Sequence, residues 1–369
     1  MQVQPGHQSN HCKVTFLRHC NHPDPPTKHA FFIEGGGTKG VYAIGILKYL
    51  SDMNPYIKLD GIDLFGGTSI GSYIAAGLSL GCRKDDFDQI AKKIDIADLT
   101  DKGYMFAWTM YRFATYGYLY NDGGRRKVIS TILNQRNAQI KKHLELPDST
   151  KFDAMDLKIG ELRKLIIKYP ETYRHLIINT VDLNRNQQLF ITTLEDKWDT
   201  IKLSDGLLAS SALPFVFQPM QFYYDSATDT YSYIPSATST LNQLIDGGAA
   251  TNNPLDYFLI HDNHHTYNLW LLVFSSAPTY VPLPTTYSVL TRFISFLISG
   301  KNDVKTTFIH SHYKINTINL HSNANTLDYY TPAQIQQIIE DIYNQCVSGQ
   351  IHFESDTGTD KKKIDIVIV

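Results

Sequence analysis

The apolar positions of the chain fall into short, nearly uncharged runs that are separated by glycine-rich turns. Residues 30–34 form one such run, which ends at three glycines and is followed by an apolar segment at 41–50. The same order recurs in the run 62–65, the turn 66–69 and the apolar segment 70–80. Each unit predicts a buried strand, a tight turn and a buried helix, and two such units in succession favour a parallel sheet covered by helices.

Later segments extend this pattern. Further strands, covered on both faces, are predicted at 176–181 and 269–274, and the polar stretch 225–240 indicates a surface excursion or hairpin. Residues 287–298 are an apolar helix candidate, and Thr331-Pro332 predicts the start of a helix that reaches about Cys346. The apolar end 364–369, after three lysines, fits either a surface anchor or an added strand.

Two apolar stretches leave their role open. Eight aromatic residues lie between Tyr104 and Tyr120; they could line an apolar substrate groove, but packing in a helical layer is the more common role. Residues 289–298 could form an interfacial helix on a membrane, but core packing is again the more common outcome.

Composition narrows the class of protein. The 369 residues are 43% hydrophobic, enough for a sizeable core, and 34 basic against 36 acidic residues give no general attraction to nucleic acid. We therefore expect no nucleic-acid partner. No secretory signal or membrane-spanning run is readable, and four cysteines without an export signal fit reduced thiols, so we expect a cytoplasmic protein. The spacing of Cys12 and Cys20 matches no common zinc pattern, which favours a plain polar tail.

A serine stands at the second glycine turn. Gly67-Thr68-Ser69-Ile70-Gly71 has the Gly-x-Ser-x-Gly form of a nucleophile elbow, which lifts a serine hydroxyl clear of the sheet between a strand and a helix. The pattern alone is common by chance. Its position between a predicted strand and an apolar helix is what makes Ser69 a candidate nucleophile.

The first glycine turn is suited to hold an anion. In Gly35-Gly36-Gly37-Thr38-Lys39-Gly40, unhindered backbone N–H groups precede a helix and can point at a negative oxygen. The same residues satisfy the Gly-x-Gly-x-x-Gly dinucleotide fingerprint, and Asp60 follows at a suitable distance. However, Asp60 precedes its predicted strand, whereas a ribose-binding carboxylate belongs at the far end of one.

A carboxylate follows a later apolar pair. Asp246-Gly247-Gly248 comes directly after Leu244-Ile245 and is followed by Asn252-Asn253-Pro254. An Asp-Gly pair is usually only a turn, and Asp122-Gly123-Gly124 is a second copy of the tripeptide. The apolar residues before Asp246 and the asparagines after it distinguish the two copies.

Taken together, these segments resemble the patatin-like phospholipase family. Its pattern of a Gly-Gly-Gly-x-Arg/Lys-Gly loop, a Gly-x-Ser-x-Gly elbow, an Ala-Ser-x-Ala-x-Pro block and an Asp-Gly-Gly/Ala carboxylate occurs here in order, at residues 35–40, 67–71, 209–214 and 246–248. The resemblance covers about residues 31–274 and implies a three-layer α/β/α fold with a mostly parallel central sheet. It also implies hydrolysis of fatty acyl esters of glycerolipids by a Ser-Asp dyad without histidine.

By this resemblance, Ser69 is the nucleophile and Asp246 the base, while the amides of Gly35, Gly36 and Gly37 bind the oxyanion. Lys39 takes the Arg/Lys position of the loop and is either a docking or anion-steering residue or a solvated lysine. The block 209–214 is expected to pack beside the site without reacting. We expect no cofactor and no metal.

The resemblance also suggests an organisation and a setting. We expect a polar tail at 1–28, a catalytic domain at 29–280 and a mainly helical C-terminal extension at 281–369. A membrane phospholipid or other glycerolipid would be the substrate, reached by transient, peripheral membrane contact from the cytoplasm. Because uncontrolled lipid hydrolysis damages membranes, we expect an activating partner, ligand or oligomerisation.

Three alternatives remain open from the residues. An α/β-hydrolase with a Ser-His-acid triad would use one of the late histidines 261, 264, 265, 310 or 312, but it normally has several strands before its elbow. A non-catalytic nucleotide-binding module would use residues 35–40 as a phosphate cradle. An acyltransferase would keep the same fold and pass the acyl group to an alcohol.

Overall fold

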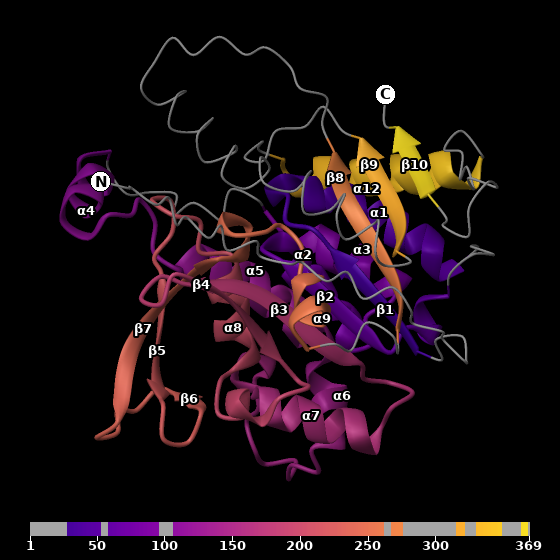
Figure 1. The fold of residues 1–369 in the computed structure, drawn as a ribbon. Helices are drawn as coiled ribbons and strands as arrows, with labels where there is room; N and C mark the ends of the chain where they lie inside the picture. Colours follow the sequence, from indigo (N-terminus) through magenta and orange to yellow (C-terminus); the bar gives the residue numbers. More distant parts are fainter. Residues whose placement is uncertain are drawn as a thin grey trace, which may run out of the picture.

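The computed structural model describes residues 28–52, 58–95, 106–261, 267–275, 315–321, 330–348 and 363–367. They form a ten-stranded mixed sheet with helices packed on its two faces (Figure 1). The strands are β1 Lys28–Ile33, β2 Leu64–Thr68, β3 His175–Asp182, β4 Gln187–Thr192, β5 Met220–Asp225, β6 Thr230–Ser232, β7 Ser239–Asp246, β8 Tyr267–Ser275, β9 Ile315–His321 and β10 Lys363–Val367. The helices used below are α1 Gly40–Asp52, α2 Ile70–Ser79, α3 Lys84–Lys93, α4 Phe106–Tyr116, α5 Gly123–Leu133, α6 Asn137–His143, α7 Ile159–Lys168, α8 Leu203–Ser210, α9 Asp256–His261 and α12 Pro332–Val347.

The sheet has a parallel part and an antiparallel part. In the order β10-β9-β8-β1-β2-β3-β7-β5-β6, the strands from β10 to β3 run parallel. The pairs β3–β7, β7–β5 and β5–β6 are antiparallel, and β4 also pairs with β3 in this sense. The α/β/α class is confirmed, as are both central strands. The expected hairpin at 225–240 is confirmed by β5, β6 and β7.

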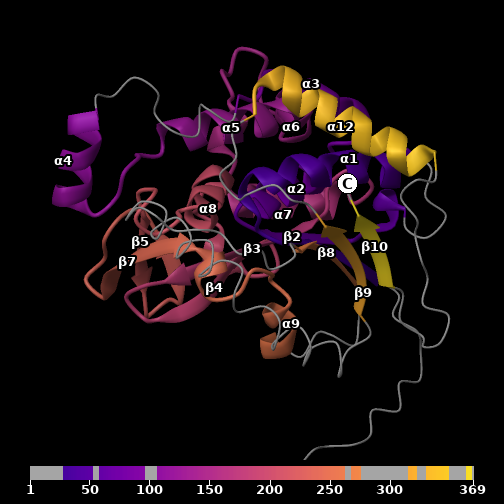
Figure 2. The same cartoon turned by 90° about the horizontal axis from the view of Figure 1, so that it is seen from above.

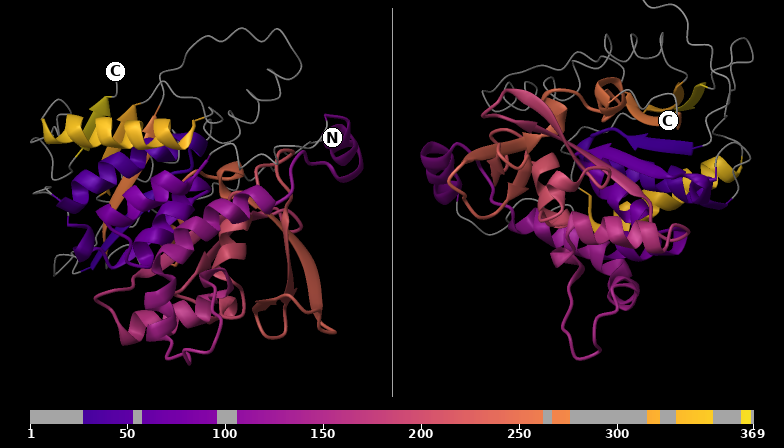
Figure 3. Two further views of the ribbon diagram at one scale, coloured as in Figure 1. Left: turned by 180° about the vertical axis from the view of Figure 1, so that it is seen from behind. Right: turned by 60° about the horizontal axis from the view of Figure 1, so that its bottom comes forward.

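Alternate residues of the central strands build two cores. On β1, Phe31 and Ile33 join the larger core, which α1, α2 and α8 cover, while Ala30 and Phe32 face the smaller core beneath α9. Seen from behind, the helices of the larger layer cover the sheet (Figure 3). This period of two explains why β1, β3 and β8 read as continuous apolar runs: a strand covered on both faces has no solvent side to keep polar.

The glycines before the serine belong to a strand rather than a turn. The sequence suggested that the strand ends at Phe65, but β2 continues through Gly66, Gly67 and Thr68. Gly66 and Gly67 pair with β1 on one side and β3 on the other, which fixes them in the sheet. The turn is therefore reduced to Ser69 alone, directly before α2.

The aromatic stretch forms α4 but does not pack as a layer. Trp108, Tyr111 and Tyr116 are exposed large side chains, so the expectation that these aromatics pack in a helical layer was wrong for these three. In Figures 1 and 2, α4 stands apart from the other labelled helices.

The C-terminal part adds to the same sheet. Helix α12 begins at a Thr331–Gln334 capping box, as expected, and lies over α1 and α3 (Figure 2). The apolar end forms strand β10, which is parallel to β9. The helix expected at 287–298 and the interfacial alternative for it fall outside the described residues. So do residues 1–27 of the expected polar tail, whereas Lys28 already belongs to β1. The division into three regions remains a prediction.

The turn around Ser69 makes a specific demand on Gly71. A Cβ atom at Gly71 would collide with the carbonyl oxygens of Ile33 and Glu34. Alanine normally stabilises a helix relative to glycine, but here the clash with backbone should reverse the sign and cost about 1–3 kcal/mol. Urea unfolding of Gly71→Ala measures this. Gly206→Ala, in α8, is the matched control, because its Cβ would meet its nearest neighbour at 3.4 Å, an ordinary contact. Equal loss in both variants would contradict the close approach.

Candidate active site

Ser69 occupies a strained turn between β2 and α2. Its backbone has φ 54° and ψ −126°, a conformation that non-glycine residues rarely adopt, and its side chain is nearly buried. A Cβ at Gly67 would collide with the backbone of Gly71, so both glycines of the elbow are required by the tightness of the turn. The predicted nucleophile elbow geometry is therefore present at Ser69.

The block 209–214 is hydrogen-bonded to the turn at Ser69. The Ser69 amide donates to Oγ of Ser210 at 2.9 Å, and that hydroxyl donates to the carbonyl oxygen of Asn179 at 2.6 Å. The Asn179 side-chain amide donates to Oγ1 of Thr68 at 3.0 Å and to the carbonyl of Thr251 at 2.7 Å. This chain of hydrogen bonds ties β2, β3 and α8 together around the serine. The sequence pointed to Ser210 through its block, but it gave no signal for Asn179.

Asp246 ends β7 and is fully buried. Its amide donates to the carbonyl of Ala212 at 3.0 Å, and its Oδ1 accepts from the Gly248 amide at 2.8 Å. Burial raises the pKa of Asp246 from 3.8 to about 6, while the Gly248 amide, the Ser69 hydroxyl and the charge of Arg125 lower it in part. The Asp-Gly-Gly turn thus fixes Oδ1 through its hydrogen bond to Gly248, whereas Oδ2 takes no part in the turn.

Ser69 and Asp246 are brought together. The Ser69 hydroxyl favours the ionised form of Asp246, yet Oδ2 of Asp246 has no partner of full hydrogen-bond geometry among the described residues. The contact between the Ser69 hydroxyl and Asp246 is therefore longer or less aligned than a complete hydrogen bond. Catalytic hydrogen bonds are often long before substrate binds.

The glycine loop lies against the serine. A Cβ at Gly35 would meet Cβ of Ser69 at 3.2 Å and Oδ1 of Asn252 at 2.5 Å. The Gly35 amide donates to the Asn252 carbonyl at 3.3 Å, whereas no acceptor is recorded for the amides of Gly36 and Gly37 within the described part of the chain. Gly37 has φ 56° and opens the short helix that leads into α1. Gly36 and Gly37 are thus better placed than Gly35 to donate to a ligand.

Lys39 is buried, so the alternative of a solvated lysine was wrong. It lies in the last turn of the short helix Gly37–Lys39 and has interactions of its own. A steering or docking role for it remains a prediction.

Arg125, on α5, is a buried cation that the sequence did not single out. Its guanidinium donates to the Leu208 carbonyl at 2.7 Å, to Oγ of Ser211 at 3.2 Å and to the Gln218 carbonyl at 3.0 Å. Burial lowers its pKa, and its charge favours ionised Asp246. A Gly-Gly-Arg-Arg sequence at the start of a helix is typical of a helix end that is exposed to solvent. No pattern in the sequence therefore indicated that Arg125 is buried near Asp246.

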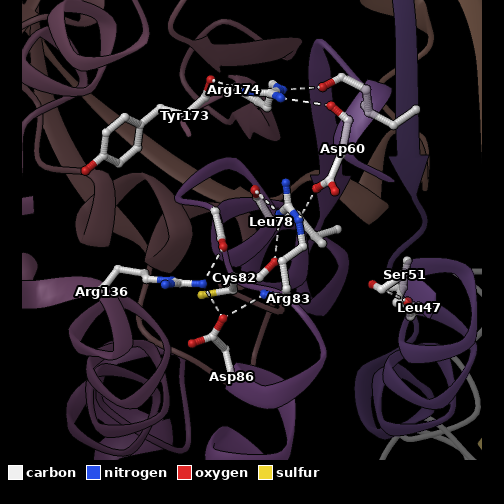
Figure 4. A network of polar contacts seen from close by, with 12 residues as sticks. Leu47, Ser51, Asp60, Leu78, Cys82, Arg83, Asp86, Arg136, Tyr173 and Arg174 are labelled. Carbon is white, nitrogen blue, oxygen red and sulfur yellow. Dashed lines mark hydrogen bonds and ion pairs between the residues drawn. The ribbon is translucent and has the colours of Figure 1, made fainter. Parts of the chain in front are cut away.

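A polar network holds the far end of α2. Arg83 donates to Oδ1 of Asp60 at 2.6 Å and to the Cys82 carbonyl at 2.8 Å, and Arg136 donates to the Gly81 carbonyl at 2.6 Å (Figure 4). Asp86 links the two arginines by accepting from the Arg83 amide and pairing with Arg136. The network fixes the helix that carries the elbow, and it uses Asp60, the residue that a dinucleotide site would need.

Other predicted candidates are engaged elsewhere or fall outside the described residues. His261, on α9, contacts Glu195 at 3.7 Å, and the histidines 264, 265, 310 and 312 fall outside the described residues. Asp122, in the second Asp-Gly-Gly copy, forms an ion pair with Arg126 at 2.7 Å.

In the described ranges, no group of three or more His, Cys, Asp or Glu side chains is arranged to hold a metal ion. None of the described helices has the length and apolar character needed to cross a bilayer.

Comparison with known proteins identifies the family. The patatin-like phospholipase profile matches residues 31–259. An uncharacterized protein of Acanthamoeba polyphaga mimivirus is 47% identical over 338 residues, covering 90% of this chain and 91% of that protein. The cGAMP-activated phospholipase of Escherichia coli is 25% identical, over 63% of this chain and 54% of its own length. The crystal structure of VipD from Legionella pneumophila has the same fold, with a TM-score of 0.50 at 15% identity, over 88% of this chain and 66% of that one. The chain belongs to the patatin-like phospholipase family, a family of lipid hydrolases.

The raised pKa of Asp246 has a consequence for stability. A carboxyl whose pKa rises on folding binds its proton more tightly in the folded state, so its contribution is present below 3.8 and is lost as pH rises through about 6. At pH 8 the ionised, buried group should cost about 3 kcal/mol, and about half of that at pH 5.

Asp246→Asn removes this charge. We therefore expect the variant to be more stable than wild type, by up to about 3 kcal/mol at pH 8 and by about half as much at pH 5. Urea unfolding of both proteins at the two pH values measures the difference. A variant that is less stable than wild type at pH 8 would show that the carboxylate is well solvated or fully paired.

Proposed function

We propose that this protein is a phospholipase A-type hydrolase, which cleaves fatty acyl esters of glycerophospholipids with Ser69 as nucleophile and Asp246 as general base. One observation carries the proposal: a serine in a strained strand-to-helix turn lies beside a fully buried carboxylate with a raised pKa. One oxygen of that carboxylate makes no hydrogen bond to any residue that the structure describes. A base with a pKa near neutrality is suited to accept a hydroxyl proton. The family membership supports the substrate class.

The reaction would proceed by acyl transfer. Oδ2 of Asp246 accepts the proton of the Ser69 hydroxyl as Oγ attacks the ester carbonyl carbon, and the resulting tetrahedral intermediate expels the lysolipid alkoxide, which takes the proton back from Asp246. Asp246 then takes a proton from water as the water oxygen attacks the acyl carbon. The second tetrahedral intermediate expels Oγ of Ser69, which takes the proton back from Asp246 as the fatty acid is released. Oδ1 stays bonded to Gly248 throughout, which holds the carboxylate in one orientation.

The glycine loop would stabilise the oxyanion. The Gly36 and Gly37 amides are the proposed donors, because Gly35 already donates to Asn252. They precede α1, whose positive N-terminal end adds a favourable field for negative charge. Because a carboxylate is a weak base for a hydroxyl, these donors should matter about as much as the base, and the loss of one typically costs on the order of 10²–10³ in rate.

Regulation by an activating ligand or partner remains part of the proposal. Relatives of this chain include phospholipases that are named for activation by cGAMP, which supports a ligand-controlled enzyme without identifying a ligand for this chain. Equal specific activity at all protein concentrations, with no added factor, would count against it.

The dyad is tested by fatty-acid release from phosphatidylcholine vesicles. We expect Ser69→Ala and Asp246→Asn each to reduce release by on the order of 10³-fold or more, because the nucleophile and its base act as one unit. Asp122→Asn is the matched control, since it changes the same Asp-Gly-Gly tripeptide at an ion pair on α5 and should retain wild-type activity.

Two results would contradict the dyad. An active Asp246→Asn beside a dead Ser69→Ala would place the base elsewhere and favour the histidine triad. Loss of activity in Asp122→Asn as well, with all three variants still folded, would show that the loss in Asp246→Asn is not specific to the dyad.

The pH profile tests the role of Asp246 as a base. Because only the ionised carboxylate accepts a proton, turnover should fall as pH drops through about 6. The positive charge of Arg125 lowers the pKa of Asp246, so Arg125→Met should move this acid limb to higher pH, while Arg125→Lys, which keeps the charge, should leave it nearer wild type. An acid limb at the same pH in all three proteins would exclude an electrostatic role for Arg125.

A further inference from the structure

Helix α4 and a nearby loop present an exposed aromatic surface, which comprises Trp108, Tyr111, Tyr116 and Phe215. These side chains are 49%, 53%, 62% and 46% exposed, respectively. Trp108 and Tyr111 lie one turn apart on α4, and their rings stack with centroids 5.3 Å apart. Several large aromatic side chains that are exposed to solvent close together indicate an interaction site.

The aromatic surface is joined to the wall of the active site. The chain leaving α4 pairs with the segment after the block 209–214: the Leu119 amide donates to the Phe215 carbonyl at 3.1 Å, and the Tyr120 amide donates to the Val216 carbonyl at 2.8 Å. Three residues before Phe215, the carbonyl of Ala212 accepts the amide of Asp246. The Phe215 end of this surface is therefore continuous in the chain with the segment that binds the backbone of Asp246.

The charge of the surface favours a lipid occupant. From Phe106 to Tyr120 the sequence contains no acidic residue, and its only charged residue, Arg112, is buried. Contact with lipid head groups therefore desolvates no carboxylate. The exposed residues are Trp, Tyr and Phe rather than aliphatic residues, and Trp and Tyr have the apolar rings with polar tips that concentrate at the interface between lipid and water.

We propose that the aromatic surface of α4 and Phe215 docks the enzyme on a phospholipid bilayer, so that an ester bond can pass from the membrane directly to Ser69. The inference rests on the proposed function for its substrate and adds the surface by which that substrate is reached. In Figures 1, 2 and 3, α4 extends away from the main body, which lets it enter an interface while the sheet stays in water.

Intrinsic fluorescence tests the docking directly, because the chain has three tryptophans and the other two, Trp198 and Trp270, are buried. Ser69→Ala protein is mixed with phosphatidylcholine vesicles, so that no hydrolysis alters the lipid. We expect the emission to shift to shorter wavelength and to be quenched by bromine-labelled acyl chains. Trp108→Phe in the same background should still bind the vesicles but should lose the shift.

Vesicle flotation measures the contribution of the surface to binding. Trp108→Ala and Tyr111→Ala should each weaken binding about tenfold, as expected when a large aromatic loses its apolar burial. Ile167→Ser is the matched control, because Ile167 is an even more accessible apolar residue (75% exposed) on α7, on another part of the molecule. This variant should bind as wild type. Added salt should change binding little, since the surface has no exposed charge.

Hydrolysis of a short-chain, monomeric phosphatidylcholine separates the two proposals. If Trp108→Ala hydrolyses this substrate like wild type but loses activity on vesicles, docking by α4 is supported. Vesicle binding without any change in Trp108 emission, or equal binding by all variants, would overturn it and leave the dyad untouched. A blue shift that follows protein concentration without lipid would also overturn it, because a second copy of the chain would then cover the surface. Loss of all hydrolysis with normal docking would instead contradict the proposed reaction.

Discussion

The close approach of the Ser69 turn to strand β1 is the constraint on which the site depends. Gly71 lies against the carbonyl oxygens of Ile33 and Glu34, and Gly67 lies against Gly71. The start of α2 is therefore in direct contact with the end of β1. This contact brings the glycine loop 35–37, which follows β1, so close to the serine after β2 that a Cβ at Gly35 would lie 3.2 Å from Cβ of Ser69. Parallel neighbours in a sheet end at the same edge, and the small residues remove the remaining separation.

The site also depends on a balance of charge at low solvation. Burial alone would make Asp246 a neutral acid, while the Gly248 amide and the charge of Arg125 act in the opposite direction. The result is a carboxyl with a pKa of about 6, which is ionised at neutral pH. Arg125 donates to backbone carbonyls and, within the described part of the chain, forms no direct ion pair with a carboxylate, so its charge can act on Asp246 over distance.

The fold was predictable where burial alone sets the pattern. The alternation of apolar runs and glycine turns predicted β1, α1, α2, β3 and β8, because a strand or helix covered on all sides must be apolar throughout. The extent of β2 was not predictable, since glycines in a sheet and glycines in a turn look alike in sequence. The exposure of α4 was missed for a related reason: an aromatic helix has the same composition whether it packs in a core or faces an interface.

The candidate site shows the same limit at the level of single residues. Ser69 and Asp246 lie in short motifs with a local meaning, so the order of those motifs was sufficient to select them. Asn179 and Arg125 act through contacts with residues that are far away in sequence, 111 positions for Asn179 with Thr68 and 83 for Arg125 with Leu208. The same tripeptide also occurs where it has no role in the site: in Asp122-Gly123-Gly124, at the start of α5, the aspartate forms an ion pair with Arg126. A motif therefore selects the groups that are proposed to react, whereas the fold determines the charge and solvation that would allow them to do so.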